Sequence, residues 1–560
     1  MPGPILLAAT LLIAAVAASP FAHIKNGLVL GSTSGNVDTF LGIPYADPPV
    51  GNLRLRRPQP LSKPLGTFNA TVVPRACPQK ILTGEVPIFD TLPDAIREAY
   101  VNANATINST GEDCLSINVQ RPANTTRGAK LPVLFWIYGG AWEDGATVNS
   151  DYSAVVSTSI TLGEPVIVVA ANYRLNTFGY LGGKELKAEG NTNLGLRDQR
   201  LALEWVQEHI EAFGGDSNKV TLWGQSAGGV SVLNHLMIHG GNRTSKRSGR
   251  PLFRAGIMHS AAEFPALPVD SEPAQSLYDL TVSRAGCSNA SSTTDCLRAL
   301  PYEQLLDATN SLPYLFSPEG FRLRYVPRPD DSDDFFTAAE YESGAGIADV
   351  PLIIGHQEDE ATVFSVPTSE VTSSEKLVST LLTWIPNGSR ATLDGLVKFY
   401  NGDEETGAPF RTNSSQNAYP NSKINSAVTS DLLFIFRIRS FISKLVGPLP
   451  VDKHSSPVWS YQATYLHGYP YLGTFHGSDL ALFASAGALA QVAYDDIVGR
   501  YVRFVNSGVP DSPSGKEAWP VYDGKKQLLQ FTADGEDVIV DDAREEAYKY
   551  FITVQNQLKY

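Results

Sequence analysis

The fold is decided by the stretch VTLWGQSAGGVSVL at residues 220–233. Its first four residues are apolar or β-branched and predict a buried strand, and residues 229–233 are typical of the start of a helix. Between them, the string Gly-x-Ser-x-Gly puts Ser226 on a sharp strand-to-helix turn. In such a turn the serine has a strained backbone, and its hydroxyl faces a cleft. The string alone is weak evidence, but the flanking strand and helix favour a nucleophilic serine over a structural glycine-rich turn.

Short β-rich apolar segments recur along the chain, and helix-like stretches follow them. They occupy residues 131–138, 165–172, 220–223, 255–259 and 350–354. This alternation predicts an α/β fold with a large, mostly parallel central sheet flanked by helices. Residues 196–213 have a nearly helical apolar period, and we expect Gly214, Gly215 and Asp216 to end that helix.

The composition is that of a globular protein with a large core. Hydrophobic residues make up 43% of the 560 residues and charged residues 18%. Acidic residues outnumber basic ones by 58 to 44, which gives a net charge of -14, and no Lys/Arg cluster could bind a phosphate backbone. We therefore expect no nucleic-acid partner. No repeat, low-complexity tract or long polar linker divides residues 19–560, which predicts a single domain with insertions.

The first eighteen residues predict a secretory signal peptide. They contain an apolar run that ends in the small-residue series at 15–18, although no Lys or Arg precedes it. No later segment has the roughly 18 uninterrupted apolar residues that a membrane-spanning helix needs. The polar C-terminal end also lacks a lipid-anchor pattern. We therefore expect a secreted, soluble mature protein.

Two covalent modifications fit export. Asn-x-Ser/Thr glycosylation sequons occur at Asn69, Asn104, Asn108, Asn124, Asn242, Asn289, Asn387 and Asn413. The four cysteines allow three pairings. We favour Cys77 with Cys114 and Cys287 with Cys296, because the second pair closes a short Ser/Thr-rich loop whose ends must lie close together. Oxidising export compartments permit both modifications.

A second turn follows the segment at 131–138. Residues 139–142, GGAW, carry few side chains that could shield the backbone amides. Such amides can stabilise the negative charge that develops on a carbonyl oxygen, which contributes about 3 to 4 kcal/mol per donor. From the residues alone, a tight turn without a catalytic role is an equally good interpretation.

Together these stretches resemble the type-B carboxylesterase/lipase family, which includes fungal lipases, animal carboxylesterases and cholinesterases. The matching motifs, in the family's order, are EDCLSINV at 112–119, NYRL at 172–175, NLGLRDQ at 193–199, FGGD at 213–216 and the turn at 224–228. The resemblance covers nearly the whole mature chain. It implies the α/β-hydrolase fold and a secreted serine esterase or lipase that needs no metal or cofactor. It also implies a small-molecule or lipid ester as substrate and transient contact with a lipid interface.

The resemblance also implies which residues form the site. The loop GHQEDE at 355–360 resembles the family's acid-bearing loop and places the triad acid at Glu360. The loop GTFHGSD at 473–479 resembles the histidine loop and makes His476 the base. The oxyanion hole would use the amides of Gly140, Ala141 and Ala227. Spacing alone leaves Asp359 and Glu358 open as acids and His467 open as a base.

The chain departs from the family's pattern at three positions. Gln225 stands before the nucleophile where Glu is usual, Ala141 stands where a third Gly is common, and Ala361 replaces a frequent Gly after the acid.

The segment between Cys77 and Cys114 resembles the long flap of fungal lipases, and either a mobile lid or a fixed surface loop is consistent with it. It contains no Trp, which disfavours a cholinesterase because those enzymes hold a quaternary ammonium group there by a cation–π contact.

Three other functions need consideration. His235 and His239 have a spacing that suits two metal ligands on a helix, but Leu236 stands where a metalloprotease motif needs Glu. A non-catalytic adhesion or binding protein of the same fold typically loses a triad residue, whereas all three are present here. Amide hydrolysis is a weaker alternative, because the amine is a poorer leaving group. The sequence leaves the acyl length, the alcohol and the oligomeric state open.

Overall fold

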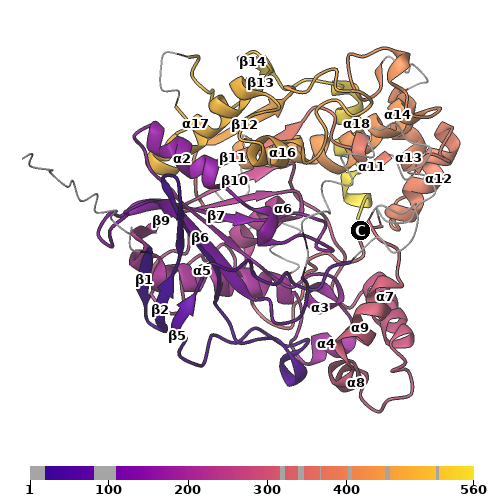
Figure 1. Ribbon diagram of the computed structural model, residues 1–560. Coiled ribbons are helices and arrows are strands. Elements are labelled where there is room, and N and C mark those ends of the chain that lie inside the picture. The colour runs from indigo at the N-terminus through magenta and orange to yellow at the C-terminus, as the bar shows by residue number, and fades with distance from the viewer. Residues whose placement is uncertain are drawn as a thin grey trace, which may run out of the picture.

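The computed structural model describes residues 19–80, 107, 109–315, 322–337, 346–365, 368–400, 406–447, 454–511 and 516–559. Figure 1 shows a large twisted sheet with helices packed against it and two further groups of helices beside it, α7–α9 and α12–α14. The predicted signal peptide, most of the flap at 78–113, and the sequons at Asn104 and Asn108 lie outside the described residues.

The large sheet has eleven strands in the order β14-β13-β12-β11-β10-β9-β7-β8-β6-β4-β3. The strands from β13 to β8 in this order run parallel, whereas β14, β6, β4 and β3 pair antiparallel at the two edges. The parallel strands are β7 (Leu131–Ile137), β8 (Ile167–Ala171), β9 (Gly215–Gln225), β10 (Ala255–His259), β11 (Leu352–Gln357), β12 (Val458–Ala463) and β13 (Gln527–Phe531). The edge strands are β3 (Ser32–Ser34), β4 (Val37–Pro44), β6 (Ser116–Pro122) and β14 (Glu536–Val540). The predicted mostly parallel sheet is confirmed.

A second, small sheet uses strands that lie on both sides of β3 and β4 in the sequence. It pairs β1 (Phe21–Ile24), β2 (Gly27–Leu30) and β5 (Gly66–Asn69) in the order β1-β2-β5. The five segments that the sequence predicted as strands are all strands. Their bounds differ from the predicted ones except in β10, and the largest difference is in β9, which begins at Gly215 rather than at residue 220. Its first residues extend the pairing with β7 past an irregularity next to Leu131.

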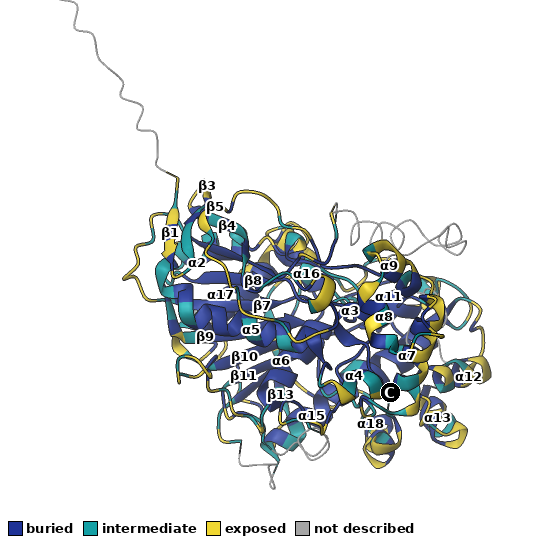
Figure 2. Ribbon diagram, turned by 90° about the horizontal axis from the view of Figure 1, so that it is seen from below, coloured by how far each residue is buried: buried dark blue, intermediate teal, exposed yellow. Residues whose placement is uncertain are grey.

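The central strands are buried on both faces. Every residue of β8, β10 and β11 is buried, without the alternation that a strand with one solvated face would have. Figure 2 shows these strands in dark blue between layers of helices. The helices α2 (Ser153–Thr161) and α17 (Gln491–Ser507) contact each other, as do α5 (Leu194–His209) and α6 (Ala227–Met237), and α5, α6 and α17 all contact β9. The nucleophile strand is therefore deep in the molecule.

The predicted helix at 196–213 is present as α5 followed by a 3₁₀ turn, Ile210–Phe213. Gly214 ends it in the left-handed conformation, with φ 87°. The other helices are α3 (Asn176–Tyr180), α4 (Lys184–Ala188), α7 (Glu272–Arg284), α8 (Thr293–Ala299), α9 (Tyr302–Asn310), α11 (Thr362–Ser365), α12 (Ser374–Trp384), α13 (Arg390–Val397), α14 (Ser422–Ser430), α15 (Phe436–Val446), α16 (Ser478–Ala484) and α18 (Glu545–Val554). None of the helices in the described ranges is long and apolar enough to span a bilayer.

Both favoured disulfides are formed. Cys77 bonds to Cys114 with the Cα atoms 4.9 Å apart, and Cys287 bonds to Cys296 with the Cα atoms 5.8 Å apart. The six sequons within the described ranges, at Asn69, Asn124, Asn242, Asn289, Asn387 and Asn413, are all exposed. Exposure is what glycosylation requires, and the modification itself stays a prediction.

His235 on α6 makes the stability of the fold depend on pH. Its side chain is fully buried, and burial lowers its pKa to about 3, with a smaller contribution from the charge of Arg200. The folded protein therefore keeps this imidazole neutral, whereas the unfolded chain binds a proton below its ordinary pKa of about 6.5. The stability that neutral His235 contributes is complete above that pH and is lost as the pH falls.

We predict that the free energy of unfolding decreases through this residue alone by about 1.4 kcal/mol for each pH unit between 6.5 and about 3. The variant His235→Gln, which keeps a donor for Gln199, should have a shallower decline between pH 6 and 4. Urea unfolding at a series of pH values measures both slopes. Equal slopes in the wild type and the variant would contradict this prediction.

Candidate active site

Ser226 lies in the predicted turn between β9 and α6. It is the N-cap of α6 and has φ 55° and ψ -127°, a conformation that non-glycine residues rarely adopt. Such a residue costs on the order of 1–3 kcal/mol and persists only where the surroundings enforce it. Here the Ser226 N–H donates to the carbonyl of His259 at 2.9 Å, and the Ser226 carbonyl accepts from the N–H of Val230 at 2.9 Å. Both ends of the strained residue are thus fixed.

Two glycines make this turn possible through close approach of the backbone. A β-carbon at Gly224 would lie 2.4 Å from the carbonyl oxygen of Gly228. A β-carbon at Gly228 would lie 2.0 Å from the carbonyl oxygen of Ile137 on β7. Any side chain at either position would push α6 away from the ends of β9 and β7. The glycines of the motif are therefore steric requirements of the turn.

Glu360 and His476 meet across two loops that follow β11 and β12. The Nδ1 atom of His476 lies 2.6 Å from Oε2 of Glu360, whose other oxygen accepts the N–H of Gln357 at 2.8 Å. The Glu360 side chain is 0% exposed and that of His476 is 7% exposed. Because the carboxylate accepts from Nδ1–H, Nε2 of His476 carries the lone pair and can act as a base.

The other acids in the Glu360 loop have different partners. Glu358 forms a bidentate pair with Arg411, with N–O distances of 3.0 and 2.7 Å. Asp359 is fully buried and accepts the N–H groups of Phe410 and Thr474, and burial together with the charge of Glu358 raises its pKa. The alternative base, His467, is 41% exposed and lies 4.0 Å from Glu358. Of these acids, only Glu360 hydrogen-bonds to His476.

Neutral groups surround the rest of the His476 ring. The amide Nε2 of Gln225 lies 3.2 Å from Nε2 of His476, so the amide donates to the lone pair of the neutral ring. The ring also packs against Phe364 and Phe434, with centroid distances of 4.9 and 4.7 Å. Phe434 belongs to a π-helical turn, Asp431–Ile435. Neither phenylalanine could be recognised in the sequence, because each comes from a segment without a motif.

The turn predicted to hold an oxyanion also has an unusual backbone. Gly140, Ala141 and Trp142 have φ values of 95°, 54° and 58°. The Gly140 carbonyl accepts the N–H groups of Glu143 at 2.8 Å and Asp144 at 3.1 Å, which folds the turn back on itself. Ala227 is the first residue of α6, so helix geometry leaves its N–H without a partner within the helix.

Two buried carboxyl groups support this turn, and sequence reasoning missed both. Burial raises the pKa of Asp144 to about 6, against the effect of a hydrogen bond from the Tyr314 hydroxyl. Burial also raises the pKa of Glu143, which accepts the N–H of Leu315 at 3.0 Å. Their partners Tyr314 and Leu315 lie 170 and 172 residues further along the chain, so nothing beside positions 143 and 144 marked these acids.

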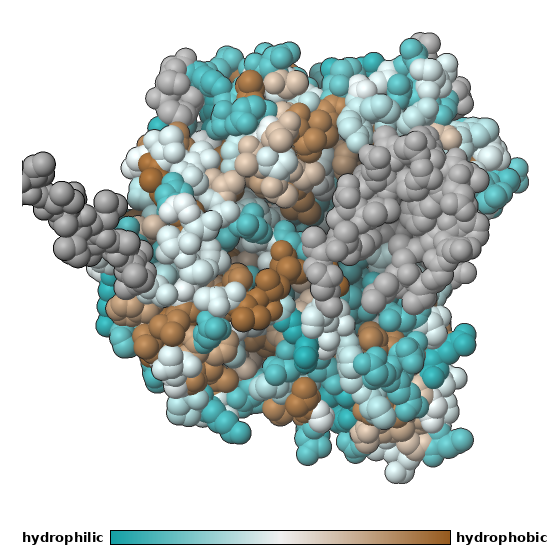
Figure 3. Space-filling model, viewed as in Figure 1, coloured by the Kyte–Doolittle hydropathy of each residue, from teal (hydrophilic) through white to brown (hydrophobic). Residues whose placement is uncertain are grey.

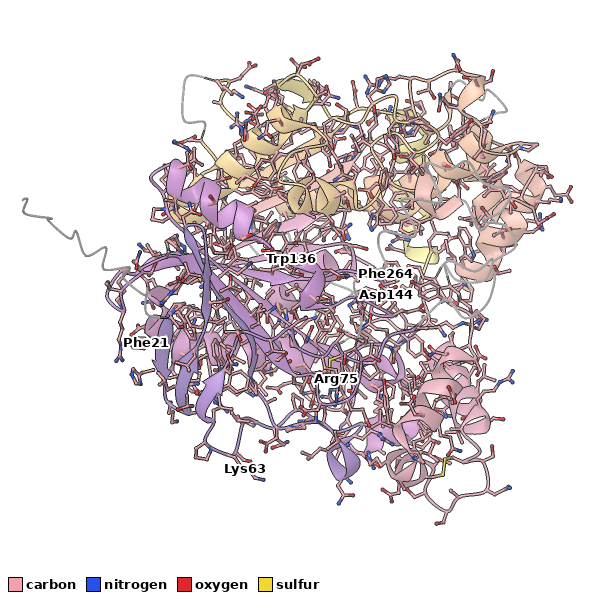
Figure 4. The ribbon with its side chains drawn as sticks, viewed as in Figure 1. Phe21, Lys63, Arg75, Trp136, Asp144 and Phe264 are labelled. Carbon is pink, nitrogen blue, oxygen red and sulfur yellow. A yellow bond between two sulfur atoms is a disulfide. The ribbon has the colours of Figure 1, made fainter. Side chains whose placement is uncertain are left out.

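A mostly apolar cavity adjoins Ser226. Its walls include Ala141, Trp142, Ser226, Ala227, Val230, Ser260, Ala261, Ala262, Glu263, Phe264, Leu315, Leu323, Phe364, Leu433 and Phe434. Ala141 and Ala227, two of the predicted oxyanion donors, are therefore on the same cavity as the serine, together with both phenylalanines that contact His476. Figure 4 labels Phe264 and Asp144 near the centre of the molecule. In the same view, Figure 3 shows apolar side chains gathered in the middle of the visible face, below α16.

The two histidines with metal-ligand spacing do not form a metal site. His235 is buried, and its Nε2 lies 3.0 Å from Oε1 of Gln199. His239 follows α6, and its Nδ1 lies 2.7 Å from the carbonyl oxygen of Asp334. Within the part of the chain that the structure describes, no group of three or more His, Cys, Asp or Glu side chains could hold a metal ion.

Comparison with known proteins identifies relatives over nearly the whole chain. The family model described as "Carboxylesterase family" matches residues 18–551. A secreted triacylglycerol lipase of Gibberella zeae is 42% identical over 94% of this chain and 89% of its own length. Secreted lipase 1 of Botryotinia fuckeliana is 40% identical over 96% of this chain and 93% of its own.

Among solved structures, the crystal structure of EstA from Aspergillus niger has the same fold. It superposes with a TM-score of 0.78 and covers 97% of this chain and 99% of its own, at 23% sequence identity. This likeness confirms the α/β-hydrolase fold that the motifs predicted.

The contact between Gln225 and His476 generates a prediction about pH. A carboxylate at position 225 would lie beside Nε2 and would stabilise the protonated imidazole. We predict that Gln225→Glu moves the acid limb of the pH–rate profile for ester hydrolysis upward by up to about one pH unit. Gln527→Glu on β13, which β10, β11 and β12 separate from β9, adds the same charge and should leave the limb unchanged. If the acid limb of the pH–rate profile is at the wild-type pH in both variants, a charge at position 225 does not affect the pKa of His476, and the prediction is wrong.

Proposed function

The chain belongs to the carboxylesterase family and is a carboxylic ester hydrolase, and on that premise we propose that Ser226, His476 and Glu360 carry its chemistry. The observation that best supports this assignment is the 2.6 Å hydrogen bond from the His476 imidazole to the buried Glu360. This imidazole contacts Gln225, the residue before the strained serine. A nucleophile, a base and a group that orients the base are the three parts that acyl transfer needs.

In the first step, Ser226 Oγ attacks the ester carbonyl carbon while His476 Nε2 accepts its proton. Glu360 holds the ring in the tautomer with a free Nε2 lone pair and stabilises the imidazolium that forms. The carbonyl oxygen becomes an oxyanion, which the amides of Gly140, Ala141 and Ala227 stabilise. Collapse of this intermediate breaks the bond to the alcohol, and His476 returns the proton to the leaving oxygen.

In the second step, water replaces the alcohol. His476 removes a proton from water, the resulting hydroxide attacks the acyl-enzyme, and the same amides stabilise the second oxyanion. Its collapse releases the carboxylic acid and restores the Ser226 hydroxyl with the proton from His476. Every proton moves through His476, so no metal or cofactor takes part in the proposed cycle.

The cavity supports a preference for apolar acyl groups. Three phenylalanines line it, Phe264, Phe364 and Phe434, together with Leu315, Leu323 and Leu433, so burying an acyl chain there is favourable by about 0.8 kcal/mol per methylene. We propose neutral, apolar esters as substrates. Transient contact with a lipid interface follows for water-insoluble esters, and the name of the Gibberella zeae relative refers to triacylglycerols.

We also propose that the protein is secreted, with residues 1–18 as a cleaved signal peptide. The two relatives compared above are named as secreted lipases, and two disulfides and six exposed sequons suit an oxidising export compartment. Protein collected from the culture medium of an expressing fungus should lack residues 1–18 and carry glycans. Retention of the N-terminal segment inside the cell would contradict export.

Replacing the nucleophile tests the proposed chemistry. We predict that Ser226→Ala lowers the rate of hydrolysis of a short-chain nitrophenyl ester by at least about 10³-fold, because no acyl-enzyme can form. Glu360→Gln should also lose activity, because a neutral amide no longer stabilises the imidazolium. Unfolding midpoints equal to that of the wild type would show that both variants fold. Full activity in Ser226→Ala would exclude this serine, and no activity in the wild type would favour the non-catalytic binding protein.

A charge placed on the cavity wall tests the proposed substrate class. Leu433 is 6% exposed, and we predict that Leu433→Asp lowers kcat/KM for long-chain esters and emulsified triacylglycerol by about tenfold or more, because the chain would pack against a carboxylate. Activity on an acetyl ester should change much less. Leu280→Asp, at a position on α7 that is 37% exposed, is the matched control and should change neither activity. A uniform loss over all chain lengths in Leu433→Asp would argue against an acyl site there.

A further inference from the structure

A second buried carboxylate–imidazole pair lies beside the first. The Nδ1 atom of His259, the last residue of β10, is 2.6 Å from Oδ2 of Asp479. The side chain of His259 is 1% exposed and that of Asp479 is 4% exposed. Neither residue takes part in the proposed reaction.

The hydrogen bonds of His259 fix the state of its ring. Its Nε2 accepts the indole N–H of Trp223 at 2.9 Å, so Nδ1 must carry the proton that Asp479 accepts. Aromatic rings enclose the imidazole, with centroid distances of 5.4 Å to Tyr501, 5.9 Å to Tyr461 and 6.0 Å to Phe483. Both ring nitrogens are satisfied, and the packing leaves the ring little freedom to turn.

His259 also contacts the nucleophile turn through its backbone. Its carbonyl oxygen accepts the Ser226 N–H at 2.9 Å, and its Cα pairs with that of Gln225 in the parallel register between β10 and β9. One residue therefore holds the reactive serine with its main chain and Asp479 with its side chain.

Asp479 connects this residue to the histidine loop. It lies three residues after His476, in the first turn of α16, which begins just beyond Gly477. On its other side, His476 is held by the hydrogen bond to Glu360 and by the bond from its own N–H to the Glu360 carbonyl at 3.3 Å. Those bonds orient the ring but do not attach the loop to β10. The Asp479 bond supplies that second attachment.

We propose that His259 is a positioning residue for the hydrolase reaction, which clamps Asp479 and so sets where the His476 ring meets Ser226. This inference rests on the proposed function. A displacement of about 1 Å between a nucleophile and its base can cost on the order of 10²-fold in rate. The hydrogen bond from His259 to Asp479 affects how Ser226 and His476 are placed relative to each other. Its loss should therefore lower kcat and leave substrate binding nearly unchanged.

The test compares two replacements of His259. His259→Leu replaces the imidazole by an apolar side chain that cannot donate to Asp479, and we expect kcat for a soluble nitrophenyl ester to fall by about 10- to 100-fold with KM within about twofold of the wild-type value. His259→Asn places an amide N–H near the position of Nδ1 and should restore kcat to within about fivefold of the wild type. His235→Leu removes another buried imidazole, which donates to Gln199, and should leave kcat within about twofold.

Folding is checked by near-UV circular dichroism and by the unfolding midpoint of each variant. If His259→Leu does not fold, Asp479→Leu removes the acceptor from the same bond at a similar side-chain size, and the same fall in kcat is expected. A folded His259→Leu enzyme with wild-type kcat would overturn the proposal. So would a folded His259→Asn enzyme that is as slow as His259→Leu, or a slow His235→Leu enzyme. Failure of the proposed function itself would be distinct, because the wild type would then not depend on Ser226.

Discussion

Two backbone contacts without room for a β-carbon determine this active site. Gly224 packs on the carbonyl of Gly228, and Gly228 packs on the carbonyl of Ile137, so α6 begins directly at the ends of β9 and β7. The chain must reverse between them within one residue, and Ser226 therefore takes φ 55°. This conformation points a reactive side chain out of the sheet and leaves the first N–H of α6 free for an oxyanion. The strain at Ser226 is maintained because the carbonyl of His259 on β10 and the N–H of Val230 on α6 hold the two sides of the turn.

The same close packing determines which charged and neutral side chains lie near Ser226 and His476. His476 has one carboxylate partner, Glu360, and otherwise neutral neighbours, Gln225 and two phenylalanines. The buried carboxylate of Glu360 is therefore the group that stabilises the imidazolium. Burying this charge costs free energy, and a well-aligned hydrogen bond to His476 compensates for that cost. The Asp359 side chain, which accepts the N–H groups of Phe410 and Thr474, ties the acid loop to the histidine loop and helps to maintain that geometry.

The sequence was informative wherever a local steric or periodic rule applied. The strand-turn-helix around Ser226, the parallel sheet and the left-handed Gly214 that ends the 3₁₀ turn after α5 follow from such rules, and the motif order added the fold family. It could not distinguish Glu360 from Asp359 by spacing, because that choice depends on which carboxylate meets a loop more than a hundred residues away. Phe434, Asp144 and His259 escaped notice for the same reason. Each acts through contacts between distant segments, and nothing in its immediate neighbours marks it.

The central claim is that folding activates one serine among many. The most direct measurement is reaction of the native protein with a fluorophosphonate, followed by peptide mapping with mass spectrometry. We expect one phosphonyl group per molecule, on the peptide that contains Ser226, and none after unfolding in urea. Labelling of a different serine in the folded protein, or no labelling at all, would contradict the claim.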